Sequence, residues 1–298
     1  MNARVKAEFF LFSITLIWGT TFVTTKIVLE HVSPFLYIAI RFFAASILFG
    51  ALFFRQVRML GTSAVLKGAI LGLFLFIGFA LQTVGLEYTT ASKSAFVTGM
   101  LVVLTPLCQI IIERRMPNAG NVVGVILVTA GLYFLTSPQG AKFNIGDALT
   151  LGCALCFALY IVYLDMFTKE FNVAQLTFVQ FATAAVGGGF VALAVETRSL
   201  ELNATFVGAV SYLVVMATVV ALYVQTKYQK ETTPTRAAII FSVEPVIAAI
   251  FAYFVLGEKI GWLGILGGGL IMAGLIVSQL SDLLLSVIGI AKNDRSSA

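Results

Sequence analysis

Long apolar segments alternate with short polar breaks along the whole chain. A membrane-spanning helix needs about 20 apolar residues, because in hydrocarbon every backbone N–H and C=O must find a partner within the segment. Ten stretches of this kind occur, at approximately 8–29, 34–54, 66–87, 92–112, 118–137, 146–166, 173–195, 206–228, 235–256 and 260–281. The pattern predicts an all-α integral membrane protein with ten transmembrane helices.

The composition favours lipid over water as the main solvent. Hydrophobic residues make up 59% of the 298 positions and charged residues 11%, with a mean hydropathy of +1.00. A soluble domain carries roughly 25% charged residues, so this chain has too few to cover a water-facing surface. The net charge of +5 comes from Lys and Arg residues scattered singly near helix ends, so no nucleic-acid partner is expected.

The basic residues also predict the orientation in the membrane. Cytoplasmic loops are enriched in Lys and Arg. With a cytoplasmic N-terminus, thirteen basic residues lie at cytoplasmic ends and five at outer ends, while Arg41 lies inside a helix. Arg4 and Lys6 precede an apolar run that lacks a small-residue cleavage site, which predicts an uncleaved first helix. We therefore expect a multi-pass plasma-membrane protein, in the inner membrane if bacterial, with both termini cytoplasmic.

An internal repeat divides the chain into two halves. Short motifs of the first half recur in the second at a separation of 143 residues. The matched residues are Gln82-Thr83 with Gln225-Thr226, Thr89-Thr90 with Thr232-Thr233, Lys93 with Arg236, Gly124 with Gly267, and Ala130-Gly131-Leu132 with Ala273-Gly274-Leu275. The predicted repeats are 1–137 and 144–281, with five helices each. Residues 282–298 are a predicted cytoplasmic tail, whose apolar part is too short to span and is expected at the membrane surface.

A second separation, of 139 residues, relates other positions. Arg41-Phe42 align with Gln180-Phe181, and Pro106 aligns with Pro245. The two separations differ by about one helical turn, and we expect this difference to lie before each proline. Because proline removes a backbone donor, Pro106 and Pro245 are predicted to kink the fourth and ninth helices.

The number of helices in each half predicts how the halves are related. Five crossings are odd, so the second half begins on the opposite side of the membrane from the first. A pseudo-two-fold axis in the membrane plane should therefore relate them. Inverted repeats are a recurring feature of secondary transporters, in which a central site opens alternately to each face. The repeat thus predicts a small-molecule transporter working by alternating access.

Several motifs resemble the EamA domain of the drug/metabolite transporter superfamily, in two tandem copies over nearly the whole chain. They are Trp18-Gly19-Thr20-Thr21-Phe22, Arg41-Phe42, the segment 88–96, Glu244-Pro245 and Leu256-Gly257-Glu258-Lys259. The resemblance implies efflux or exchange of small metabolites, such as amino acids, nucleotide-like compounds or drugs, without ATP. The chain has no G-x-x-x-x-G-K-[ST] motif. It departs from exact duplication at Thr105-Pro106, where the first half lacks the carboxylate of Glu244.

Two charged residues lie inside predicted helices. A charge near the bilayer centre costs about 2.5–3.5 kcal/mol or more, so such groups are functional-site hypotheses. Glu244 is predicted to bind a substrate ammonium group or to carry a proton, or else to hold helices together as a neutral or paired carboxyl. Arg41 is predicted to bind a substrate carboxylate, to pair with Glu244, or to anchor its helix at the membrane surface.

Uncharged polar groups near helix centres complete the candidate substrate-binding or coupling site. They are Trp18, Thr21, Tyr160, Gln82 and Gln225. Some should face a cavity, although Thr and Gln side chains also join helices by hydrogen bonds. Lys93 and Arg236, at the starts of the fourth and ninth helices, are interpreted as interfacial anchors or as groups at the two mouths of a pathway.

The sequence predicts no catalytic residue, metal site or cofactor, and hence no enzyme. All three cysteines lie in apolar segments, the one histidine lies in a loop, and neither H-E-x-x-H nor G-x-S-x-G occurs. The alternative function is a channel or lipid-type flippase on the same inverted repeat. Expected partners are a small-molecule substrate and the lipid bilayer. Substrate identity, direction, proton coupling and a homodimer joined through glycine motifs of the fifth and tenth helices are left open.

Overall fold

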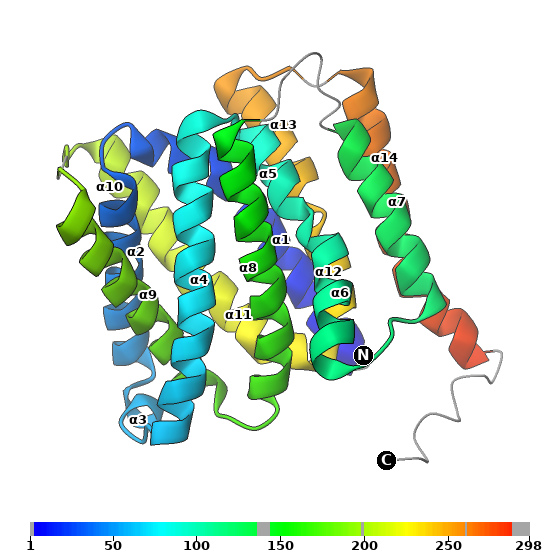
Figure 1. The fold of residues 1–298 in the computed structure, drawn as a ribbon, viewed down its shortest axis with the longest axis horizontal. Helices are drawn as coiled ribbons and strands as arrows, with labels where there is room; N and C mark the ends of the chain where they lie inside the picture. Colours follow the sequence, from blue (N-terminus) through cyan, green and yellow to red (C-terminus); the bar gives the residue numbers. More distant parts are fainter. Residues whose placement is uncertain (1–2, 136–143, 198–199, 260, 288–298) are drawn as a thin grey trace.

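The computed structural model describes residues 3–135, 144–197, 200–259 and 261–287, with side chains described up to residue 280. Within these ranges the chain is a bundle of long helices (Figure 1). The first half contains α1 (Ala3–Leu29), α2 (Pro34–Leu52), the short α3 (Phe54–Val57), α4 (Thr62–Tyr88), α5 (Ala91–Gly99), α6 (Leu101–Glu113) and α7 (Ala119–Leu135). The second half contains α8 (Ile145–Thr168), α9 (Val173–Val195), α10 (Ala204–Tyr212), the π-helix η1 (Leu213–Val220), α11 (Ala221–Tyr228), the 3-10 turn η2 (Gln229–Glu231), α12 (Pro234–Phe241), α13 (Glu244–Leu256) and α14 (Trp262–Val287).

These elements correspond to the ten predicted segments, with ends that differ by a few residues. In the described part of the chain, nine helical segments are long and apolar enough to cross a membrane, and α7 is a shorter apolar helix. The all-α membrane class is therefore confirmed. One difference lies at the C-terminal side, where α14 continues to Val287, so the first part of the predicted tail is helical. Residues 288–298 lie outside the described residues.

The two halves interlock instead of lying side by side. The first helix of one half packs on the broken fourth helix of the other, as α1 packs on α12 and α13 and α8 packs on α5 and α6. The second helices α2 and α9 pack on each other, as do the fifth helices α7 and α14. The two fourth helices cross so that α5 contacts α13 and α6 contacts α12. Each contact has its counterpart with the halves exchanged, as an inverted repeat requires.

The fourth helix of each half is broken at the same repeat position. Helical structure is interrupted at Met100, between α5 and α6, and at Ser242-Val243, between α12 and α13. Met100 and Val243 are separated by 143 residues, and this separation holds again further on, at Gly124 and Gly267. The expected one-turn difference before the prolines is therefore wrong. Pro106 lies inside the continuous helix α6, whereas Pro245 is in the first turn of α13 and directly follows the break.

Glycines allow the fifth helices α7 and α14 to approach each other closely. A Cβ atom at Gly131 would lie 2.6 Å from the carbonyl oxygen of Gly267, and one at Gly124 would lie 2.9 Å from that of Gly274. These two contacts are equivalent under the repeat, so they lie on either side of the pseudo-two-fold axis. Small residues permit such helix contacts in membranes. At these positions the glycines join helices within one chain.

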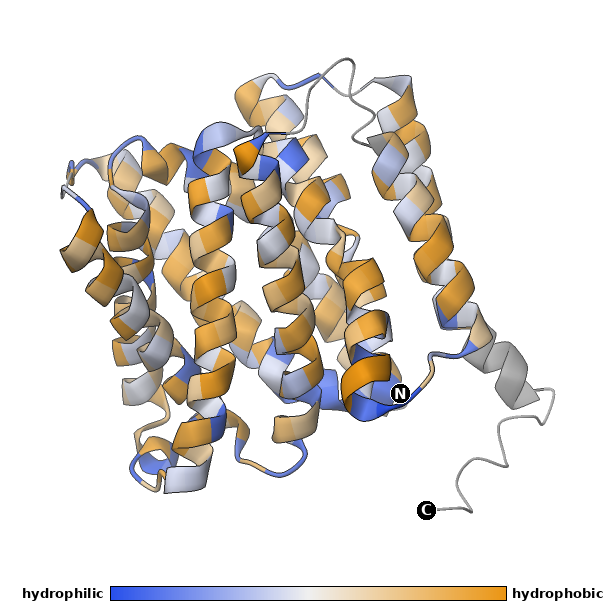
Figure 2. Ribbon diagram, in the orientation of Figure 1, coloured by the Kyte–Doolittle hydropathy of each residue, from blue (hydrophilic) through white to orange (hydrophobic). Residues whose placement is uncertain are grey.

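The outer surface of the bundle is suited to lipid. Large apolar side chains such as Phe43, Phe190, Phe254 and Ile265 are exposed. Hydrophobic residues extend along the helices, and hydrophilic residues gather at the two ends of the bundle (Figure 2). We call the end that the basic residues assign to the cytoplasm the cytoplasmic end, and the opposite end the outer end.

This orientation predicts the labelling of two exposed loop residues. Met59 follows α3 at the cytoplasmic end, Leu202 precedes α10 at the outer end, and their side chains are similarly exposed, at 77% and 74%. In a cysteine-free background, Leu202→Cys should react with a membrane-impermeant maleimide on intact cells. Met59→Cys should react only after the membrane is opened. Equal labelling of both on intact cells would contradict the orientation.

Candidate functional site

A cavity lies where the two halves meet. It has a volume of about 60 Å³, which is room for a few water molecules. Six of the lining residues come from α1, α2, α4 and α5: Trp18, Thr21, Arg41, Phe79, Gln82 and Thr98. The others are Leu75 and Leu101 of the first half and Phe157, Tyr160, Ile161, Leu222, Gln225, Phe241 and Glu244 of the second half. Both repeats therefore build one shared site.

All seven residues proposed from the sequence as binding or coupling candidates line this cavity. The sequence reasoning did not select the aromatic and aliphatic part of the lining, such as Phe79, Leu101 and Phe157. Such residues are indistinguishable from ordinary lipid-facing ones by composition. The repeat carries a signal for them, because the partner positions of chosen residues, found with the separations of 139 and 143, line the cavity too.

The lining consists mainly of repeat-related pairs. At a separation of 143 these are Phe79 with Leu222, Gln82 with Gln225, Thr98 with Phe241, and Leu101 with Glu244; at 139 they are Trp18 with Phe157 and Thr21 with Tyr160. A cavity lined by both members of each pair lies on the pseudo-two-fold axis. The chemistry of the pairs is nevertheless unequal, since Glu244 is opposed by Leu101. The site is symmetric in backbone and asymmetric in charge.

Glu244 owes its place to the break in the ninth helix. It is the first residue of α13, and Pro245 after it has no N–H to donate. The positive end of a helix dipole favours a negative charge at this position. Among the described residues, no group donates a hydrogen bond to the Glu244 carboxylate or forms an ion pair with it. The carboxylate is therefore available to a ligand or a proton in the cavity.

Arg41, by contrast, is held by its neighbours. Its Nε donates to Thr218 Oγ1 at 2.6 Å, and a terminal nitrogen donates to the Tyr37 hydroxyl at 3.0 Å. The guanidinium lies 4.6 Å from the centre of the Phe79 ring, a cation–π contact. No ion pair joins Arg41 to Glu244 in the described structure. The two charges face the same cavity separately, and Arg41 is too buried to act as a surface anchor.

The π-helical segment η1 has no counterpart in the first half, where α4 is continuous. Trp18 Nε1 donates to the carbonyl oxygen of Ala217 at 3.0 Å, and Thr218, the acceptor for Arg41, lies in the same segment. Insertions of π-helix are frequent at functional sites because they change which backbone groups are paired. Here η1 orients both Trp18 and Arg41 toward the cavity.

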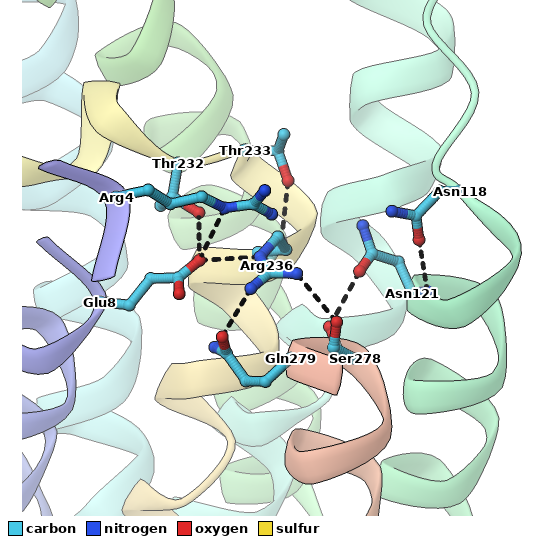
Figure 3. Close-up of polar contacts among 9 residues, drawn as sticks. All are labelled: Arg4, Glu8, Asn118, Asn121, Thr232, Thr233, Arg236, Ser278 and Gln279. Atoms are coloured by element: carbon cyan, nitrogen blue, oxygen red, sulfur yellow. Dashed lines mark hydrogen bonds and ion pairs between the residues drawn. The ribbon is translucent and has the colours of Figure 1, made fainter. Parts of the chain in front are cut away.

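A buried ion pair lies at the cytoplasmic end of the bundle (Figure 3). Arg236, in α12, donates to Glu8 Oε1 of α1 at 2.8 Å and to the Ser278 carbonyl oxygen of α14 at 2.8 Å. Thr232 also donates to Glu8 Oε1, at 3.0 Å, and Ser278 donates to Asn121 of α7 at 2.8 Å. One arginine thus connects the first, ninth and tenth helices.

The repeat places an equivalent ion pair at the outer end. Lys93 Nζ of α5 lies 2.6 Å from Asp147 Oδ2 of α8, and Thr89 donates to Asp147 Oδ1 at 3.1 Å. Lys93 corresponds to Arg236 and Thr89 to Thr232 at a separation of 143, and Asp147 corresponds to Glu8 at 139. Lys93 and Arg236 are therefore neither simple anchors nor groups free at a mouth. Each joins the first helix of one half to the fourth helix of the other.

Comparison with known proteins places the chain in a family. The model of the EamA-like transporter family matches residues 5–137 and 144–280. An uncharacterized transporter of Archaeoglobus fulgidus is 34% identical over 278 residues, which cover 93% of this chain and 87% of that protein. The uncharacterized inner membrane transporter YedA of Escherichia coli is 26% identical, with 90% and 89% covered. One solved crystal structure has the same fold, with a TM-score of 0.78 at 19% identity over 95% of this chain and 99% of the other.

Fold, cavity and comparisons together define a multi-pass membrane transporter built from two five-helix repeats. The chain belongs to the EamA-like transporter family, in agreement with its motifs. A bilayer and a small-molecule substrate are therefore its partners, and the plasma membrane or bacterial inner membrane is its location.

The ion pair at the outer end generates a stability prediction. Lys93→Gln leaves the fully buried Asp147 carboxylate without its cation, whereas adding Asp147→Asn removes the unpaired charge. The loss from Lys93→Gln should be about 1–3 kcal/mol, below the ~3–5 kcal/mol of a fully buried pair because the Lys93 side chain is 22% exposed. Thermal unfolding in detergent should show the double variant to be more stable than Lys93→Gln alone. Additive losses in the two single variants and the double variant would contradict the coupling.

Proposed function

We propose that this protein is a secondary transporter that moves a small metabolite, an amino-acid-like compound or drug, by efflux or exchange through alternating access to the central cavity. The observation that carries the proposal is the unpaired Glu244 carboxylate, which shares a cavity with Arg41 on the axis of an inverted repeat. Binding sites at broken helices near the bilayer midplane are typical of such transporters.

The crossing of the two fourth helices supports alternating access. At the cytoplasmic end, Thr235 of α12 donates to Gln109 of α6 at 2.8 Å. At the outer end, Ser92 of α5 donates to Glu258, which follows α13. Ser92 and Thr235 are repeat partners. In the proposed cycle, the cavity opens to the cytoplasm when the first bond breaks and to the outside when the second breaks.

Glu244 has two possible tasks in this cycle, and they differ in their consequences. It either carries a proton that couples transport to the pH gradient, or it binds a cationic group of the substrate. A carboxylate without protein donors in a largely apolar cavity loses hydration without compensation. Both a proton and a substrate ammonium group remove this penalty. We propose proton coupling as the first task to test.

The decisive variant is Glu244→Gln, which retains size and hydrogen-bonding capacity and removes titration. A thermal-shift screen of the purified protein first identifies a substrate, and uptake into liposomes is then measured with and without a pH gradient. If Glu244 carries the proton, pH-driven accumulation should fall about tenfold or more, while substrate exchange without a gradient persists. The matched control, Glu231→Gln, removes an exposed carboxylate at the cytoplasmic end and should behave as the parent.

Two other results have defined meanings. Weakened binding with an unchanged pH profile assigns Glu244 to the substrate cation. Normal transport with a normal pH profile makes Glu244 structural and removes the central part of the proposal. Saturable counterflow of the substrate separates a carrier from a channel.

A further inference from the structure

A second cavity, of about 240 Å³, opens at the cytoplasmic end. Its walls are the end of α6 with the following loop, the end of α8 and the start of α12. It is larger than the central cavity and differs in character, since it is lined by the charged groups Glu113, Arg115, Asp165 and Lys169. Gln109 and Thr235, the pair that closes the fourth helices at this end, also line it. The cavity therefore lies directly against the cytoplasmic closure of the central site.

Asp165 is the most informative residue of this cavity. Its side chain is 2% exposed, and its Oδ2 lies 2.5 Å from Lys169 Nζ, one turn further along α8. The other oxygen, Oδ1, is buried and accepts no hydrogen bond from any described protein group. A buried acceptor without a donor costs about 1–3 kcal/mol, more when it is charged. An external donor that enters the cavity would remove this cost.

Opposite charge is available at the rim. Arg115 is exposed and forms no ion pair within the described ranges. It follows Arg114, the only described residue other than glycine with a positive φ, at 55°. The repeat-equivalent residue is Gly257, with a φ of 68°, so the second half uses the residue that this backbone favours. The first half keeps an arginine there, at a cost of about 1 kcal/mol or more, and the turn directs the chain so that Arg115 lines the cavity.

We propose that this cytoplasmic cavity is a binding site for free α-amino acids, which it captures before they enter the central cavity. The ammonium group donates to Asp165 Oδ1, with Glu113 as a second acceptor close to it, and the carboxylate accepts from the Arg115 guanidinium. Only its place on the transport path rests on the proposed function. Binding at the cavity does not.

The site can be tested by cysteine protection without measuring transport. Met116 lines the cavity and is exposed, so Met116→Cys should react with a maleimide in inside-out vesicles. Cys108→Ala, Cys153→Ala and Cys156→Ala provide the background. Each of the twenty common L-amino acids is added in turn. At tenfold excess over its Kd, an amino acid that binds should slow labelling about tenfold. Its methyl ester, which lacks the anion, and its N-acetyl derivative, which lacks the cation, should protect much less.

Protection should be lost with Asp165→Asn and with Arg115→Gln. The matched controls, Glu170→Gln and Arg58→Gln, remove exposed charges at the same end of the bundle outside the cavity and should leave protection intact. Arg115 lies in an exposed loop, so its variant tests the site even if Asp165→Asn fails to fold. The proposal is overturned if no amino acid protects, if the derivatives protect equally, or if protection survives in both cavity variants. Protection that persists with Glu244→Gln separates this site from the central one, so the failure of the proposed function would leave it standing.

Discussion

The cost of removing a charge from water governs where this chain places its ionisable side chains. Hydrocarbon offers no hydrogen bonds, so a buried charge must have a partner or face a polar cavity. Arg236 and Lys93 meet this condition through ion pairs with buried carboxylates. Arg41 meets it with a hydroxyl on each side and an aromatic ring. Glu244 does not meet it within the described protein, and this exception marks the functional centre more clearly than burial alone.

The same constraint explains how the inverted halves hold together. Each buried ion pair joins the first helix of one half to the fourth helix of the other, and the repeat generates the pair twice, at opposite ends of the bundle. Breaking a buried pair costs more than an interhelical hydrogen bond between neutral groups. The helices joined by these pairs should therefore move together. Motion is easier across the crossing of the fourth helices, where single hydrogen bonds close the two ends.

Much of this architecture follows from the sequence because its signals are polar residues in apolar surroundings. The ten segments, the two repeats and the seven polar candidates could be predicted, since each departs from the composition of a lipid-facing helix. Phe157 and Leu101 could not, because an apolar residue that faces a cavity looks like one that faces lipid. The break at Met100 could not be placed either, since Pro106 is the more obvious breaker and lies within a continuous helix.

The π-helix and the ion pairs escaped prediction for a different reason. The segment η1 has no proline or glycine to mark it, and its function depends on tertiary partners, Trp18 and Arg41. Glu8 and Asp147 lie at helix ends, where a carboxylate is unremarkable by sequence. Only the packing of α1 on α12 and of α8 on α5 shows that each carboxylate is buried against a basic residue. Local patterns predict elements, whereas the pairing of elements decides which charges meet.

The unequal chemistry of the two halves has a thermodynamic consequence for transport. If the repeats were identical, the inward-open and outward-open states would be mirror images with equal free energies. Here the equivalent donors Ser92 and Thr235 bind different acceptors, a carboxylate at the outer end and the amide oxygen of Gln109 at the cytoplasmic end. A hydrogen bond to a charged acceptor is roughly twice as strong as one between neutral groups, so the outer closure should be the harder one to open. A ligand shifts such an equilibrium only by its difference in affinity for the two states. Glu244, present in one half alone, is the group through which a proton or a cation can supply that difference.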